Sequence, residues 1–192
     1  MNSGAIDPRR VSAEIIEAFR DAQPPDSPED FIPYDPSENV DYLYDKTWFE
    51  IANSQTILKR FSEDGVQYYF LSKELFLYLL PGFLLAVINN ERMLVNNIAY
   101  ALMDILSPAD YRPSEWVIEI YGESAYLTYD AELFSYVLDT LTSSQKKAVA
   151  HWLKLEMEQD RERRPQFYSV EAEQTKYQVA FSKWRQWCDP QA

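Results

Sequence analysis

The segment from residue 23 to residue 45 has a composition suited to binding a basic surface. From Asp21 to Asp45 the sequence contains eight carboxylates and five prolines, and it contains no Lys or Arg. Tyrosines and other apolar side chains are interleaved with these acids. Carboxylates attract a basic partner over long distances, and the rings offer apolar area to bury once contact is made. The expected partner-binding residues are Asp26, Asp30, Phe31, Tyr34, Asp35, Asp41, Tyr42 and Tyr44.

The same acids could instead supply oxygen ligands to calcium. The four best placed for this are Asp26, Glu29, Asp30 and Asp35. Calcium-binding loops of the EF-hand type need acids in a fixed register around a turn glycine. The segment has neither that register nor that glycine, so we expect no bound metal and no cofactor.

The only histidine, His151, is the next candidate for chemistry. Its neighbours on a helical face are Lys147, Lys154 and Leu155, and no carboxylate stands three or four residues away. Local spacing therefore provides neither a His–acid pair nor an H-E-x-x-H zinc motif. We expect His151 to be dispensable and the protein to have no catalytic residue.

A hydrolase is the second interpretation, because an acid/base pair needs only two carboxylates in a cleft, or His151 with one of them. The carboxylates in or beside apolar segments are Glu74, Glu91, Asp104, Glu119 and Glu132. With four glycines, the sequence has no phosphate-cradling loop and no G-x-S-x-G elbow. A third interpretation, a structural subunit of a larger assembly, predicts an extended apolar patch.

Length and composition predict one folded domain over residues 1–192. The net charge is −13, but 15% of the residues are aromatic, too many for a disordered acidic chain. Residues 1–70 hold 14 acids and 6 bases, whereas 111–192 hold 13 and 10, so the N-terminal third is the acidic end. Without a basic stripe we expect no nucleic-acid partner.

Three features indicate a cytoplasmic protein. The sequence opens MNSGAIDPRR, which is not an apolar export leader. The longest apolar stretch, 75–88, is shorter than the ~20 residues needed to cross a bilayer. The single cysteine, Cys188, excludes an intrachain disulfide.

Apolar periodicity predicts a mainly α fold, a single-domain bundle of about seven helices with one small β-hairpin. Asp7-Pro8, Ser72 and the capping box Thr142 to Gln145 should begin three of the helices. The expected helices are one over 8–23, one from Trp48 to Phe61, two meeting at Pro81, one over 93–106, one from Asp130, one from Thr142 and one after Pro165.

Two of these expectations concern irregular backbone. Pro81 should separate two buried helices, because its ring clashes with the carbonyl four residues back. The run VIEIYGESAYLTY at 117–129 should form a hairpin around Gly122, because both of its halves are rich in β-branched and aromatic residues.

A basic cluster offers an intramolecular alternative to partner binding. The acidic segment could lie across the helix that carries this basic cluster, within the same molecule. The cluster comprises Lys146, Lys147, Lys154, Arg161, Arg163 and Arg164.

Two stretches resemble an uncharacterised bacterial domain-of-unknown-function family. The first is FLSKELFLYLLPGFLLAVI at 70–88, and the second is LTSSQKKAVAHWL at 141–153. That family has an FLSxExFxYxLP core and a following LTxxQ helix, matched by Phe70, Leu71, Ser72, Glu74, Phe76, Tyr78, Leu80, Pro81, Leu141, Thr142 and Gln145. The resemblance covers about 45–160 and implies a bacterial α-helical fold without an assigned activity. Small acidic proteins of this kind are similar to immunity proteins that neutralise basic toxins.

Overall fold

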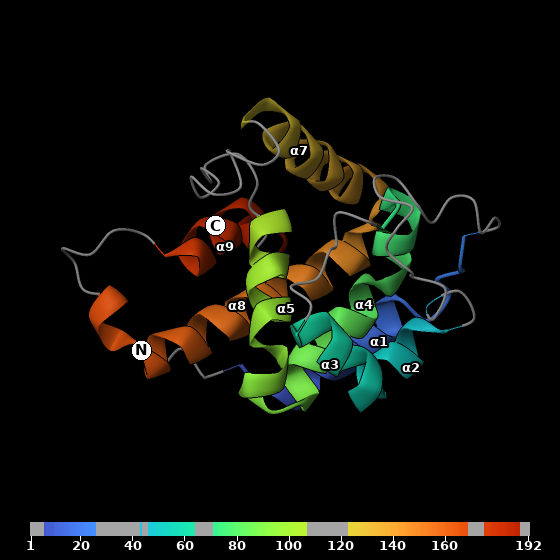
Figure 1. Ribbon diagram of the computed structural model, residues 1–192. Coiled ribbons are helices and arrows are strands. Elements are labelled where there is room, and N and C mark those ends of the chain that lie inside the picture. The colour runs from blue at the N-terminus through green and yellow to red at the C-terminus, as the bar shows by residue number, and fades with distance from the viewer. Residues whose placement is uncertain are drawn as a thin grey trace. The chain divides into compact units, whose positions relative to one another are not determined.

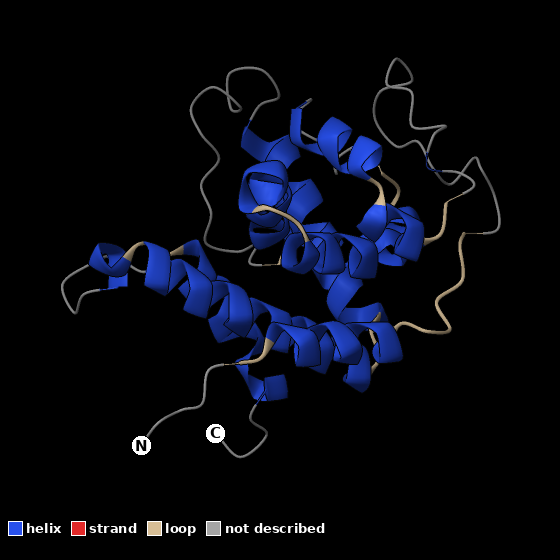
Figure 2. Cartoon of the chain, turned by 90° about the horizontal axis from the view of Figure 1, so that it is seen from below, coloured by secondary structure: helices blue, strands red, loops and turns tan. Residues whose placement is uncertain are grey.

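The computed structural model describes residues 6–25, 43, 46–63, 71–106, 123–168 and 175–188. These residues form eight α-helices and one short 3₁₀ helix (Figure 1). The elements are α1 (Pro8–Ala18), α2 (Trp48–Asn53), α3 (Gln55–Glu63), α4 (Lys73–Asn89), α5 (Arg92–Ile105), α7 (Glu123–Thr140), α8 (Ser143–Arg163), η4 (Pro165–Tyr168) and α9 (Lys176–Cys188). The described part contains no strand (Figure 2). The mainly α fold is confirmed, and the described residues alone form eight helices where about seven were expected for the whole chain.

The helices group into two compact units. The first unit joins Met1–Ala18 to Met103–Ala192, and the second is Phe19–Leu102. In the first unit α8 packs against α1, α9 and η4, and in the second α2 packs against α4 and α3. The chain therefore passes between the units twice. That 1–192 is a single domain stays a prediction.

The helix starts expected at Asp7-Pro8, Ser72 and Thr142 are confirmed, whereas the start expected at Asp130 is wrong, because α7 (Glu123–Thr140) already contains that residue. Thr142 Oγ1 accepts a hydrogen bond from Gln145 N at 3.4 Å, and Gln145 Oε1 accepts one from Thr142 N at 2.9 Å. Ser72 Oγ accepts from Leu75 N at 3.0 Å. Such bonds satisfy backbone donors that the first turn of a helix leaves unpaired.

Pro81 lies inside α4, so the expected break at this residue is wrong. The helix is continuous from Lys73 to Asn89, and its residues from Tyr78 to Val87 are all buried. A helical proline lacks one N–H and crowds the preceding turn. Burial on both sides of Pro81, which the sequence did predict, holds the helix together across this local defect. Apolar packing outweighs one lost backbone hydrogen bond here.

The expected hairpin is also wrong, because α7 already begins at Glu123. Its first half, 117–121, lies outside the described residues. The sequence expected to form the turn, Gly122-Glu-Ser, lacks the Asn-Gly or Asp-Gly pair that two-residue hairpins favour. Once a helix is nucleated, extending it backwards through Tyr126 and Thr128 adds one hydrogen bond per residue fixed. Cooperative extension thus overrides the β propensity of these residues.

Ser54 divides the single helix expected between Trp48 and Phe61 into α2 and α3. Its backbone N–H donates to Ile51 O at 3.3 Å and closes α2. Its Oγ accepts from Ile57 N at 3.3 Å and caps the start of α3. One serine therefore ends one helix and begins the next.

Helix α2 lies close along α4, and Gly82 permits this contact. A Cβ on Gly82 would stand 2.3 Å from the carbonyl oxygen of Trp48. One turn earlier on α4, Tyr78 is hydrogen-bonded to the Trp48 backbone. One turn further along α2, Ala52 O accepts a hydrogen bond at 3.4 Å from Nδ2 of Asn90, the residue that follows α4 and lies eight residues after Gly82. The two helices thus run parallel, with almost no space between them at Gly82.

Candidate functional site

The acidic segment joins two anchored residues of the second unit. Phe19 precedes the segment and Leu43 lies near its end, and each is 1% exposed. Leu43 O also accepts a hydrogen bond from Lys46 N at 3.2 Å. The expected partner-binding residues lie outside the described residues; they are Asp26, Asp30, Phe31, Tyr34, Asp35, Asp41, Tyr42 and Tyr44. The four acids considered for calcium lie outside them as well.

Most cations of the basic cluster contact groups of the first unit. The contacts are Lys146 Nζ at 5.7 Å from the Trp187 ring centre, Arg161 Cζ at 5.2 Å from that of Tyr168, Arg163 Nε donating to Gln159 O at 3.0 Å and Arg164 Nη2 at 2.6 Å from Asp160 Oδ1. Four of the six cations therefore have partners supplied by α8, η4 or α9.

A histidine–carboxylate pair joins α8 to α1. His151 Nδ1 contacts Glu14 Oε2, and Arg10 Nε donates to the other oxygen of the same carboxylate at 2.9 Å. The side chains of His151 and Glu14 are 12% and 28% exposed. No local sequence pattern predicts this pair, because its members are 137 residues apart.

The charge of Glu14 is stabilised by its two partners. Partial burial by itself raises the pKa of this carboxyl, but hydrogen bonds from His151 and Arg10 outweigh burial and lower the pKa below its usual value. Glu14 is therefore ionised at every pH above the ordinary range for glutamate. A permanently charged acceptor beside an imidazole is the arrangement that orients histidine in many sites.

Helices α1 and α8 run antiparallel. Ile6 N donates to Glu158 Oε2 at 3.2 Å, and Glu14 meets His151 seven residues earlier in α8. Of the two buried side chains of α1, Val11 lies between these contacts and Ile15 directly follows Glu14. Polar contacts therefore hold both ends of the apolar strip that joins α1 to α8.

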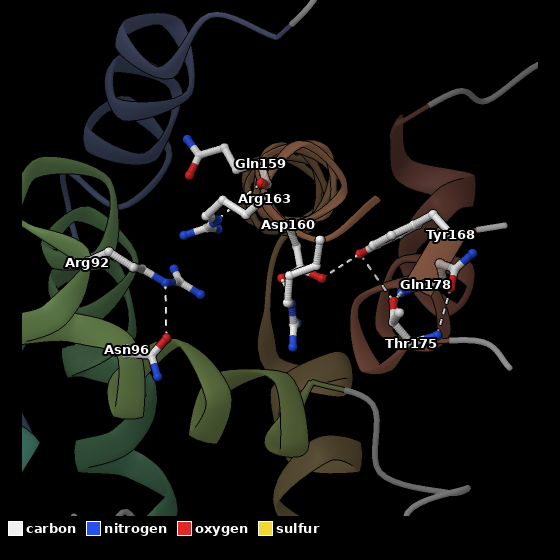
Figure 3. A network of polar contacts seen from close by, with 9 residues as sticks. Arg92, Asn96, Gln159, Asp160, Arg163, Tyr168, Thr175 and Gln178 are labelled. Carbon is white, nitrogen blue, oxygen red and sulfur yellow. Dashed lines mark hydrogen bonds and ion pairs between the residues drawn. The ribbon is translucent and has the colours of Figure 1, made fainter. Parts of the chain in front are cut away.

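A second polar network closes the C-terminal end of α8 (Figure 3). The Tyr168 hydroxyl donates to Asp160 Oδ2 at 2.8 Å, and Thr175 Oγ1 donates to the Tyr168 oxygen at 3.2 Å. Arg164 Nε donates to Asp160 Oδ1 at 2.9 Å. Asp160 is only 2% exposed, and these bonds use both of its oxygens. The network links α8, η4 and the residue that begins α9.

Tyr168 is held in its neutral form by this network. Burial raises the pKa of Tyr168 to about 12, and the hydrogen bond to the Asp160 carboxylate adds to the effect. Tyrosinate would stand beside a negative oxygen and would lose the bond it donates. The network is built for structure, since its donors and acceptors satisfy one another.

The raised pKa of Tyr168 predicts a specific loss of stability in alkali. The contribution of this hydroxyl is complete below the unfolded pKa of about 10 and disappears as the pH rises towards 12. Tyr168→Phe should lower the free energy of unfolding by about 1 kcal/mol at pH 8 and by less at pH 11. Urea unfolding of both proteins at the two pH values measures this. Gln166→Ala, an exposed change in η4, is the control, and a gap that widens in alkali contradicts the prediction.

Within the described residues, the carboxylates considered for a hydrolase lie on or beside different helices and do not form a common site. Glu74, Glu91 and Glu132 are exposed on or beside α4, α5 and α7. The side chain of Asp104 and the whole of Glu119 lie outside the described residues. Over the described ranges, no group of three or more His, Cys, Asp or Glu side chains could hold a metal ion.

The large apolar side chains exposed among the described residues are Ile16, Phe49 and Met93, which lie on three different helices. Single exposed side chains of this kind are normal on protein surfaces. None of the helices described is both long and apolar enough to traverse a bilayer.

No protein-family model, no curated protein and no solved structure matches this chain. The described residues that carry the family resemblance have structural roles. Leu71, Phe76 and Leu80 are buried, Ser72 caps α4, and Thr142 with Gln145 caps α8. The family membership stays a prediction.

Proposed function

We propose that this protein is a non-enzymatic acidic binding protein of bacterial type whose segment 23–45 contacts a basic protein partner. Its most concrete form is an immunity or inhibitor protein in the cytoplasm. The observation that carries the proposal is the run of eight carboxylates from Asp21 to Asp45 without a single Lys or Arg. Nucleic acid, membrane and cofactor are not part of the proposed function.

The charge and the rings of the segment serve different stages of binding. Carboxylates act over about a Debye length, ~10 Å at 0.1 M salt, and so raise the association rate with a basic partner. Phe31, Tyr34 and Tyr42 then bury apolar area and slow dissociation. The anchors Phe19 and Leu43 support this proposal, because they fix both ends of the segment to a folded unit.

The intramolecular alternative is weakened by the contacts of the basic cluster. Arg164 is paired with the buried Asp160, and Arg161 stacks on Tyr168. A cation already engaged in this way gains less from a second acid. Of the six basic residues, Lys147 and Lys154 are the two with the least engagement described, so the intramolecular alternative now depends mainly on these two lysines.

The proposal is tested by reversing the charge of the segment. Asp30, Asp35 and Asp41 are replaced by Lys, and wild type and variant are used to capture basic proteins from a lysate of the native host. The variant should lose the captured partner or associate with it at least tenfold more slowly at low salt. Tyr34→Ala should leave association unchanged and speed dissociation.

A matched control reverses three exposed acids outside the segment, Glu91, Asp139 and Glu162. This variant has the same net charge as the first but keeps the segment intact, so it should bind with nearly wild-type kinetics. Equal slowing by both triple variants indicates a general charge effect. Wild-type kinetics in the segment variant contradicts the proposed function.

A hydrolase is the second candidate, and the Glu14–His151 pair is the observation that favours it. An imidazole oriented by a carboxylate can act as a general base. Among the described residues, however, no serine or cysteine is hydrogen-bonded to His151. His151→Gln should preserve partner binding. Abolition of a hydrolytic activity by His151→Gln, with unchanged thermal stability, would favour the enzyme.

A further inference from the structure

Of the three large apolar side chains exposed among the described residues, Phe49 is the aromatic one. It lies on α2 and is 53% exposed. Exposure by itself indicates no function, since Met93 is 92% exposed. Aromatic side chains, however, are enriched where one protein binds another. Phe49 differs from the other two exposed side chains in its type, in the structure that supports it and in its place along the chain.

Local hydrogen bonds fix the backbone that carries Phe49. Thr47 and Glu50 form a capping box around it, in which Glu50 N donates to Thr47 Oγ1 at 3.2 Å and Thr47 N donates to Glu50 Oε2 at 2.8 Å. Asn53 Nδ2 donates to the carbonyl oxygen of Phe49 at 2.8 Å. The position of Phe49 on the surface is therefore set before any partner arrives.

The ring of Phe49 contacts the ring of a buried neighbour. Trp48 is 8% exposed, and the centres of the two rings lie 5.9 Å apart at an interplanar angle of 83°. The carbonyl oxygen of Trp48 marks the closest approach of α2 to α4, at Gly82. Because Trp48 is held by α4, it supports the ring of Phe49. A side chain that is already ordered loses little conformational freedom when a partner covers it.

Phe49 also lies close to the end of the acidic segment. The segment ends at residue 45, four residues before Phe49, so the Cα atoms of these two residues are at most about 15 Å apart. A stable interface buries about 800 Å² on each partner, which is a patch roughly 30 Å across. Leu43, 1% exposed, belongs to the same compact unit as α2. A protein that covers this end of the segment therefore extends as far as Phe49.

We propose that Phe49 is the folded part of the partner-binding surface and that its ring takes an arginine or lysine side chain of the basic partner. This inference rests on the proposed function of segment 23–45. An aromatic face attracts a cation through the quadrupole of the ring, and the methylene stem of the same side chain covers apolar area. The carboxylates of the segment attract the partner, and Phe49 binds one of its cations in a fixed place.

Binding of a fluorescently labelled nona-arginine peptide, followed by anisotropy at low salt, tests the proposal. The wild-type protein should bind the peptide, and Phe49→Ala should weaken binding about three- to tenfold. Phe49→Tyr keeps a ring and should bind like wild type. Phe49→Leu keeps apolar area without a ring and should resemble Phe49→Ala. Met93→Ala removes a more exposed apolar side chain from α5 and should have no effect.

The triple replacement of Asp30, Asp35 and Asp41 by Lys separates this inference from the proposed function. If that variant loses the peptide while Phe49→Ala binds like wild type, the inference is wrong and the proposed function stands. If neither variant changes binding, or the wild type does not bind the peptide, both are wrong. Equal weakening by Phe49→Ala and Met93→Ala also overturns the inference. If Phe49→Ala does not fold, the comparison of Phe49→Tyr with Phe49→Leu decides.

Discussion

Gly82→Ala should destabilise the protein by about 3 kcal/mol, although alanine is the better helix former by roughly 1 kcal/mol. The added Cβ would lie 2.3 Å from the carbonyl oxygen of Trp48, a backbone atom that cannot move aside alone. Relief requires shifting α2 away from α4 and straining the Tyr78 and Asn90 hydrogen bonds. Urea unfolding at neutral pH measures the loss.

The control for Gly82→Ala lies seven residues further along the same helix. Asn89 is exposed near the end of α4, and its replacement by Ala should change the free energy of unfolding by less than about 0.5 kcal/mol. If Gly82→Ala is neutral or stabilising, the close approach of α2 and α4 is not a feature of the folded protein.

Leu84→Ala should cost about 2–5 kcal/mol, the range for removing a fully enclosed leucine side chain. Leu84 is 0% exposed and lies on α4, three residues after Pro81. The substitution leaves a cavity that a continuous buried helix cannot collapse to fill. Thermal and urea unfolding should agree on the size of the loss.

Leu77→Ala is the matched control for Leu84→Ala, because it removes the same atoms from a half-buried position on the same helix. It should cost about half as much or less, in proportion to the apolar area already exposed. A Leu84→Ala protein that melts like the parent, or no more readily than Leu77→Ala, contradicts the burial of α4 described above.

Features set by neighbouring residues could be predicted from the sequence. The caps at Ser72 and Thr142 follow from side chains that reach backbone donors three residues away, so a short sequence window contains the whole interaction. The burial around Pro81 followed from apolar periodicity alone. Local rules of this kind correctly predicted most helix starts and the mainly α class.

Features that depend on competition or distance could not be predicted. The helical propagation of α7 and the continuity of α4 through Pro81 are both decided by surroundings that outweigh the preference of single residues. The Glu14–His151 pair joins residues 137 positions apart, and the sequence around each residue contains no pattern that predicts contact with the other. For the acidic segment the sequence is still the whole basis of the prediction.

The first unit is built from the two ends of the chain, and this imposes an order on its folding during synthesis. Residues 19–102 are contiguous, so the contacts within the second unit join parts of the chain that are made close together in time, whereas α1 must wait for α8. At 5–20 residues per second, the 124 residues between these helices, 19–142, take roughly 6–25 s to make. Throughout that time α1 lacks the helix against which it packs in the first unit, so the side chains of Val11 and Ile15 wait for α8 before they can be buried there.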